Sequence, residues 1–256
     1  MQICGSIVKH THFMLALLIK EFRTFFSSLT GYLILSVYLI ATGLFVWVFP
    51  GSTNPLDTGY ANLDVLFEMS PWIYLFLIPA VCMRLFADEK KQGTIELVYT
   101  RPLKEMEIVL AKYFAALLVI SVSLLFCLIY YFSIYYLGNP VGSIDSGAFW
   151  GSFIGLFLLA AVYVVIGVFS SSVTDNQIVA FLLALILCFL FYTGFDYLAD
   201  LIIFRSVQSD IYNLGIQEHY KSISRGVVDS RDLVYFIGVI VAFLLITKTV
   251  LKSRKW

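Results

Sequence analysis

Charged side chains are scarce in this sequence of 256 residues. Only 13% of the residues are Asp, Glu, Lys or Arg, whereas a soluble domain usually carries about 25%. Hydrophobic residues make up 60%, and the mean hydropathy is +0.89. The 17 basic and 17 acidic residues cancel, so the chain lacks the net positive charge that attracts nucleic acid. The composition predicts a protein that lies in the lipid bilayer and has no nucleic-acid partner.

Residues that build metal sites, disulfides and nucleophilic centres are also few. Three of the four cysteines lie inside apolar segments and none forms a C-x-x-C pair, while the three histidines form no H-E-x-x-H pattern. No Gly-Lys pair occurs, which excludes a phosphate-binding G-x-x-x-x-G-K-[ST] loop, and G-x-S-x-G is absent as well. We therefore expect a non-catalytic chain without catalytic, cofactor-binding or metal-binding residues.

Long apolar runs are the main positive feature. A bilayer core about 30 Å thick needs roughly 20 apolar residues in a helix. Six runs reach that length, and they predict an all-α membrane protein with spans at about 29–49, 66–86, 113–137, 149–170, 177–197 and 233–251. Six spans place both termini on one side of the membrane.

Basic residues indicate which side that is. Lys and Arg gather in the N-terminal segment, in 84–112 and at the C-terminal end, whereas the connections 50–65 and 138–148 contain none. By the positive-inside rule, both termini are predicted to be cytoplasmic. We expect a multi-pass protein of the cell inner membrane.

The segment before the first span divides in two. Residues 1–13 differ in composition from the rest of the chain, so we interpret them as a possible over-extended start, with Met14 as the natural one. Residues 14–28 place apolar side chains at spacings of three and four opposite Lys20, Glu21 and Arg23. This pattern predicts an elbow helix in the inner interface; the alternative is a simple extension of the first span.

The connection 87–112 is the most informative for function. Gly93 permits a sharp reversal of the chain, TIELVY comes next as a short amphipathic helix, and Pro102 ends that helix. A second helix then leads from Lys104 into the third span. A charged loop is usually only solvated, but this helix, break and helix could form a docking surface for a soluble partner.

Two further patterns concern packing and the outer side. Gly147, Gly151 and Gly155 recur every four residues and clear one helical face for close approach, either to another subunit or within the monomer. The segment 198–231 mixes apolar and polar residues and predicts an outer helical loop that is re-entrant or interfacial. Asp229 is placed to cap the last span.

The segment FADEKKQGTIELVYTRPLKEMEIVLAKY resembles the connection between the second and third spans of ABC-2 type transporter permeases. The residues that match that family's pattern, and that the resemblance implies couple the chain to an ATPase, are Glu89, Gly93, Thr94, Glu96, Leu97, Pro102 and Lys112. The resemblance covers essentially all of the chain after Met14 and implies an ABC-2 transmembrane domain of the type V exporter kind over 29–256. In that family the connection forms a coupling helix seated in a groove of the ATPase.

The outer segment LGIQEHYKSISRGVVDSRDLVYF resembles more narrowly the gliding-motility permeases of Bacteroidota, the GldF family. The matching residues are Gly226, Asp229, Arg231 and Asp232. The resemblance implies outer gate helices; an interfacial hairpin without a gating role is the alternative. It also implies ABC ATPase subunits that bind ATP and Mg, and either a second permease copy or a different membrane subunit with a large outer domain.

These patterns predict a permease subunit that couples ATP hydrolysis by a separate ATPase to export, or to a gliding or secretion machinery. The alternative is a membrane scaffold that anchors an ATPase without moving substrate itself. An intramembrane enzyme would need facing catalytic groups within the spans, and the sequence offers no such pair.

Overall fold

The computed structural model describes residues 2–51, 54–96, 104–201, 205–226 and 229–253. Within those ranges the chain is helical and contains no strand. Six helices are long and apolar enough to cross a membrane, which confirms the predicted number. They are α2 (Leu29–Trp47), α4 (Asp64–Cys82) with its continuation α5 (Arg84–Lys91), α7 (Glu105–Leu137), α8 (Ser146–Val173), α9 (Gln177–Phe189) with its continuation to Ala199, and α13 (Ser230–Ser253).

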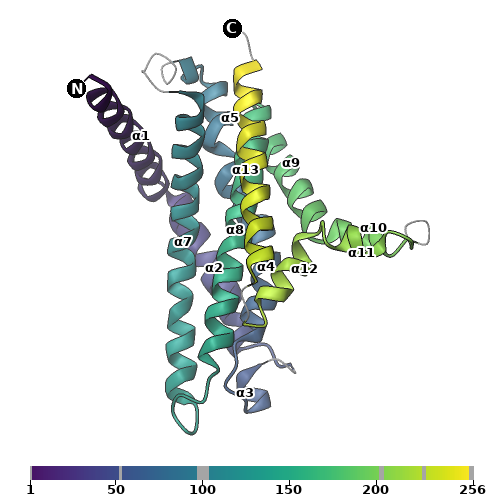
Figure 1. Cartoon of the computed structure of the whole chain (residues 1–256). Coiled ribbons are helices and arrows are strands. Elements are labelled where there is room, and N and C mark those ends of the chain that lie inside the picture. The colour runs from purple at the N-terminus through teal and green to yellow at the C-terminus, as the bar shows by residue number, and fades with distance from the viewer. Residues whose placement is uncertain (1, 52–53, 97–103, 202–204, 227–228, 254–256) are drawn as a thin grey trace.

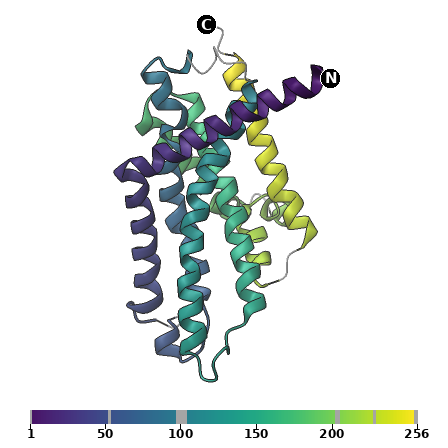
Figure 2. The same ribbon diagram turned by 90° about the vertical axis from the view of Figure 1, so that its left-hand side faces the viewer.

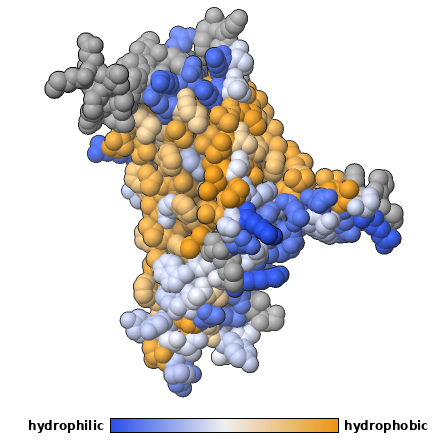
Figure 3. Space-filling view, in the orientation of Figure 1, coloured by the Kyte–Doolittle hydropathy of each residue, from blue (hydrophilic) through white to orange (hydrophobic). Residues whose placement is uncertain are grey.

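The spans form a bundle with both termini at the same end (Figure 1). The short helix α3 (Pro55–Thr58) and the connection between α7 and α8 lie at the other end. Helix α8 is central, because 72% of its most apolar window is buried, against 28% for α2 and 22% for α13. Figure 3 shows apolar surface over the middle of the bundle, which is the surface that lipid or another membrane subunit would cover.

Helix α1 (Gln2–Ser27) crosses the bundle at a large angle to the spans, near the end that carries the termini (Figure 2). It is one helix, so the elbow predicted for 14–28 is part of a longer element. The chain turns at Ser28 into α2, and a Cβ on Gly31 would overlap the carbonyl of Phe25. A glycine at this position therefore permits the tight corner between the two helices.

The second span differs from the prediction of 66–86 at the end that lies near the termini. Helix α4 ends at Cys82, and α5 begins after a break at Met83. The break would leave the first N–H groups of α5 without partners. Ser171 of α8 satisfies two of them, because its hydroxyl accepts from the N–H of Phe86 at 2.9 Å and of Ala87 at 3.1 Å.

The fifth span is also less regular than predicted. Helix α9 passes into a π-helical turn at Leu190–Gly194 and then into α10 (Phe195–Ala199). Helix α11 (Gln208–Tyr212) lies beside α10 in an arm that projects from the bundle (Figure 1). Helix α12 (Ile216–Ile223) then returns to α8 and buries Ile216, Tyr220 and Ile223.

Candidate functional site

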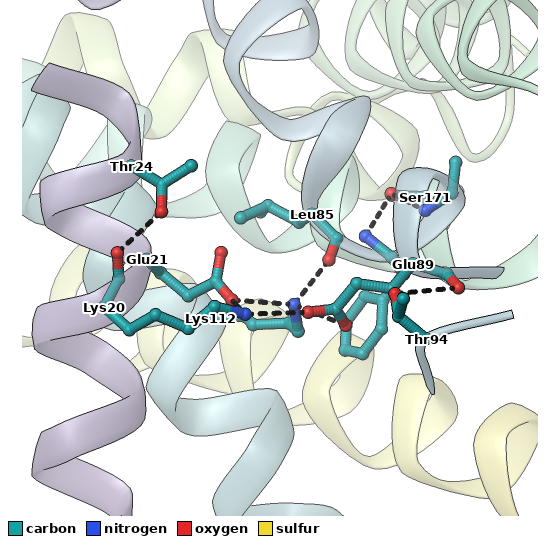
Figure 4. Close-up of polar contacts among 10 residues, drawn as sticks. Lys20, Glu21, Thr24, Leu85, Glu89, Thr94, Lys112 and Ser171 are labelled. Carbon is teal, nitrogen blue, oxygen red and sulfur yellow. Dashed lines mark hydrogen bonds and ion pairs between the residues drawn. The ribbon is translucent and has the colours of Figure 1, made fainter. Parts of the chain in front are cut away.

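A cluster of four charged side chains joins α1, α5 and α7 at the end of the bundle that carries the termini (Figure 4). Lys112 of α7 is fully buried, and its ammonium lies 2.9 Å from Glu89 of α5 and 3.2 Å from Glu21 of α1. It also donates to the carbonyl of Leu85 at 2.5 Å and lies 5.0 Å from the centre of the Phe86 ring. The ammonium is thus paired and hydrogen-bonded, which is the condition under which a charge can be buried.

Lys20 completes the cluster from the surface. Its ammonium lies 3.3 Å from Glu21 and 3.3 Å from Glu89, while its side chain remains 58% exposed. Burial lowers the pKa of Lys20, but the two carboxylates raise it by more, so the pKa lies above its ordinary value. Two basic side chains thus face two carboxylates, so the formal charges of the cluster cancel.

The cluster holds three helices that are far apart in the sequence. Removing one member of a buried ion pair leaves a buried charge without compensation, which costs about 3–5 kcal/mol. Two further contacts fix α5 to α8 and α9: Lys90 donates to the carbonyl of Ser172, and the amide of Gln177 donates to Asp88. Helix α5 is therefore held from α1, α7, α8 and α9 together.

The turn after α5 is built as the sequence predicts. Gly93 has a φ of +68°, a left-handed conformation that glycine adopts without strain. The N–H of Thr94 reaches back to the carbonyl of Glu89 at 2.9 Å and closes the helix end. Beyond the turn, Ile95 is buried in the core and Glu96 is exposed, so this element is anchored on one side and open on the other.

The predicted coupling residues thus fall into three groups. Glu89 and Lys112 contact each other, whereas Gly93, Thr94 and Glu96 form the turn and the start of the next helix. Leu97 and Pro102 lie outside the described residues.

Sequence reasoning missed Glu21. It assigned this carboxylate to the outward polar face of the elbow, but the residue is only 8% exposed and faces Lys112. A lone lysine at the entrance to an apolar span is the signal that could have prompted a search for its partner.

At the other end, the glycine face of α8 packs within the chain. A Cβ on Gly151 would lie 2.5 Å from Gly226, and one on Gly155 would lie 3.0 Å from Ile223. Of the two alternatives left open, packing within the monomer is the one the structure shows for these glycines, because the outer segment already fills the face. Gly147 instead donates its N–H to Asp145, which caps α8 at 2.9 Å.

Gly226 and Asp229 shape the backbone of the outer segment before α13. Gly226 has a φ of +86° and lies against Ala148 of α8. Asp229 accepts from the N–H of Arg231 at 3.0 Å, which confirms the predicted cap of α13. This N–H lowers the pKa of Asp229. Arg231 is exposed.

Asp232, the fourth matching residue of the outer segment, is buried at the start of α13. It is 5% exposed and lies 2.7 Å from His219 of α12. The other ring nitrogen of His219 lies 2.9 Å from the carbonyl of Asn213, and the ring stacks on Tyr235. Asp232 therefore ties α12 to α13.

A six-span bundle with a crossing amphipathic helix and an anchored turn between the second and third spans defines a multi-pass membrane protein of the permease type. The family model described as ABC-2 family transporter protein matches residues 15–255, and the chain belongs to that family. Such permeases are generally the non-catalytic membrane component, and the family implies an ABC ATPase partner. A search of curated proteins found no match.

Proposed function

We propose that this chain is the permease subunit that transmits ATP hydrolysis by a separate ABC ATPase to the bundle, for export or for a gliding or secretion machinery. The observation that carries the proposal is the bracing of α5 and the turn at Gly93. A docking element transmits force only when it is rigidly joined to the spans. Here the ion cluster joins it to α1 and α7, and Ser171 joins it to α8.

The roles of the predicted residues depend on their positions. Glu96 is exposed and would face the ATPase. Glu89 and Lys112 would act from behind by holding the element in place. ATP and Mg would be bound by the partner, and the termini and this element would lie in the cytoplasm, as the basic residues indicate.

The direct test is a charge reversal on the exposed side of the element. Glu96→Arg should leave membrane insertion unchanged and reduce copurification of the ATPase about tenfold or more, as expected for losing a charged contact. The matched control is Asp210→Arg, the same reversal on an exposed residue of α11 at the outer arm. Equal ATPase recovery from both variants would reject the docking role.

A scaffold that anchors an ATPase without moving substrate would use the same docking surface. An inactive ATPase distinguishes the transport function from the scaffold function. Loss of function with an ATPase that binds but does not hydrolyse ATP supports transport, and normal function with that partner supports the scaffold. A ligand can drive a conformational change only through unequal affinity for the two states, so transport also requires ATPase stimulation by its substrate.

A further inference from the structure

A polar pocket of about 240 Å³ opens between α1 and α5, beside the ion cluster. It is lined by hydroxyls from the corner between α1 and α2 and by charged residues of both helices: Lys20, Glu21, Thr24, Ser28, Thr30, Arg84, Asp88 and Glu89. Glu21 and Glu89 are compensated by Lys20 and Lys112. The charges that remain to be explained are those of Arg84 and Asp88.

Arg84 and Asp88 lie four residues apart on α5, so they project from one helical face about 5–6 Å apart. They form no ion pair with each other. Arg84 is exposed and its side chain has no hydrogen-bond or ion-pair partner among the described residues, and Asp88 has only the neutral amide of Gln177 there. Within the described part of the chain, the pocket therefore presents an unpaired cation and an unpaired anion a helical turn apart.

Helices α1 and α2, which contribute to the pocket, also carry exposed apolar side chains. On the α2 side, an exposed stripe runs down the helix from the corner: Leu29, Leu33, Val37 and Ile40. On the α1 side, Leu15 and Ile19 are about half exposed. A ligand with a charged head in the pocket would thus have room for hydrocarbon chains along α2, at the level where α1 crosses the bundle (Figure 2).

We propose that this pocket binds the zwitterionic headgroup of phosphatidylethanolamine from the leaflet on the side of the termini. Arg84 would pair with the phosphate, whose oxygens match the guanidinium fork. The hydroxyls of Thr24 and Ser28 already donate to the carbonyls of Lys20 and Phe25, and Thr30 is hydrogen-bonded to Ser28, so Arg84 is the donor that the pocket offers to the phosphate. Asp88 would accept from the primary ammonium, which a quaternary choline cannot offer because it has no N–H group. Lipid binding here requires no ATPase, although Glu21 and Glu89 belong both to the pocket wall and to the ion cluster.

The test measures which lipids the full-length chain retains. The protein is extracted from bilayers of equal parts phosphatidylethanolamine, phosphatidylcholine and phosphatidylglycerol, and native mass spectrometry identifies the lipids that remain bound. The wild type should retain phosphatidylethanolamine about tenfold over phosphatidylcholine, the preference expected from one charge-assisted hydrogen bond. Arg84→Gln should lose most of that retention. Its control, Arg225→Gln, removes an exposed arginine at the outer end and should behave as the wild type.

A second variant tests whether the negative charge of Asp88 selects the headgroup. Asp88→Asn keeps a hydrogen-bonding partner for Gln177 but removes the anion, so the preference should shift from phosphatidylethanolamine toward anionic phosphatidylglycerol. Equal retention of the ethanolamine and choline lipids by the wild type would overturn the proposal. So would equal behaviour of Arg84→Gln and Arg225→Gln.

Soluble phosphoethanolamine distinguishes a lipid from a free headgroup. Unchanged retention in its millimolar presence is expected, because the chains along α2 add to the affinity of the lipid. Displacement of the lipid at such concentrations would contradict a lipid site and assign the pocket to the soluble compound.

Discussion

At the scale of single residues, the buried lysine of α7 makes the contacts that join α1, α5 and α7. Lys112 is surrounded by Glu21, Glu89 and the carbonyl of Leu85, and Lys20 closes the cluster from outside. A charge in such a position persists only when its partners stay in place. The cluster thus links the crossing helix α1, helix α5 and the third span through one side chain.

Lys112→Met should lower the free energy of unfolding by about 3 kcal/mol, because Glu21 and Glu89 then lose their buried cation and keep only Lys20, whose side chain is 58% exposed. The triple variant Glu21→Gln, Glu89→Gln, Lys112→Met should recover part of this loss, since it removes all three charges. Denaturation in detergent micelles measures both. Equal loss in the single and triple variants would show that the charges are not coupled.

At the scale of elements, α12 is the piece of the outer segment that belongs to the bundle. Tyr220 donates to the carbonyl of Phe67 at 2.6 Å, and Ser152 of α8 donates to the carbonyl of Ser224 at 2.8 Å. Close approach to α8 depends on Gly151. Helix α12 therefore packs against α4 and α8 of the bundle.

Glycine substitutions test that packing with an internal control. Gly151→Ala places a Cβ 2.5 Å from the backbone of Gly226, where neither segment can yield easily, and should destabilise the protein by about 1–3 kcal/mol. Gly238→Ala in α13 meets no atom within 4 Å and should be neutral or stabilise by up to about 1 kcal/mol. Similar melting temperatures for the two variants would contradict close packing of α8 against the outer segment.

The contact between His219 and Asp232 predicts a second effect on the same element. His219→Ala leaves the buried carboxylate of Asp232 without its partner and should loosen α12, with faster hydrogen exchange over 216–223. Asp232→Asn removes that uncompensated charge, so His219→Ala should cost less in this background than in the wild type. Additive effects of the two substitutions would rule out a direct coupling.

At the scale of the whole molecule, periodicity and length sufficed to predict six spans, the shared end of the termini, the turn at Gly93 and the cap at Asp229. They did not give the break at Met83, where the N–H groups that follow are satisfied by the distant Ser171, or the π-helical turn at Leu190–Gly194 in the fifth span. The ion cluster was also missed, because Glu21 and Lys112 are separated by 91 positions. The amphipathic pattern of α1 assigned Glu21 to the exposed face. A hydropathy pattern places every carboxylate in water, whereas Glu21 is buried because it pairs with Lys112.

The bundle also indicates where other subunits could bind. Helices α2 and α13 leave most of their apolar windows uncovered, whereas the glycine face of α8 is occupied by the chain itself. A second permease copy or a different membrane subunit would therefore meet the lateral helices. Single cysteines on α2 and α13 should form crosslinks between subunits, and a cysteine at Gly155 should form none because Ile223 covers it.

The most direct test of the central claim is photo-crosslinking in living cells. A photoreactive amino acid at Glu96 should capture the ATP-binding subunit, and the same residue at Asn139, in the connection between α7 and α8 at the opposite end of the bundle, should not. Capture at 96 alone would place the docking element on the cytoplasmic side and against the motor. Capture of the ATPase at 139, or at neither position, would contradict the account.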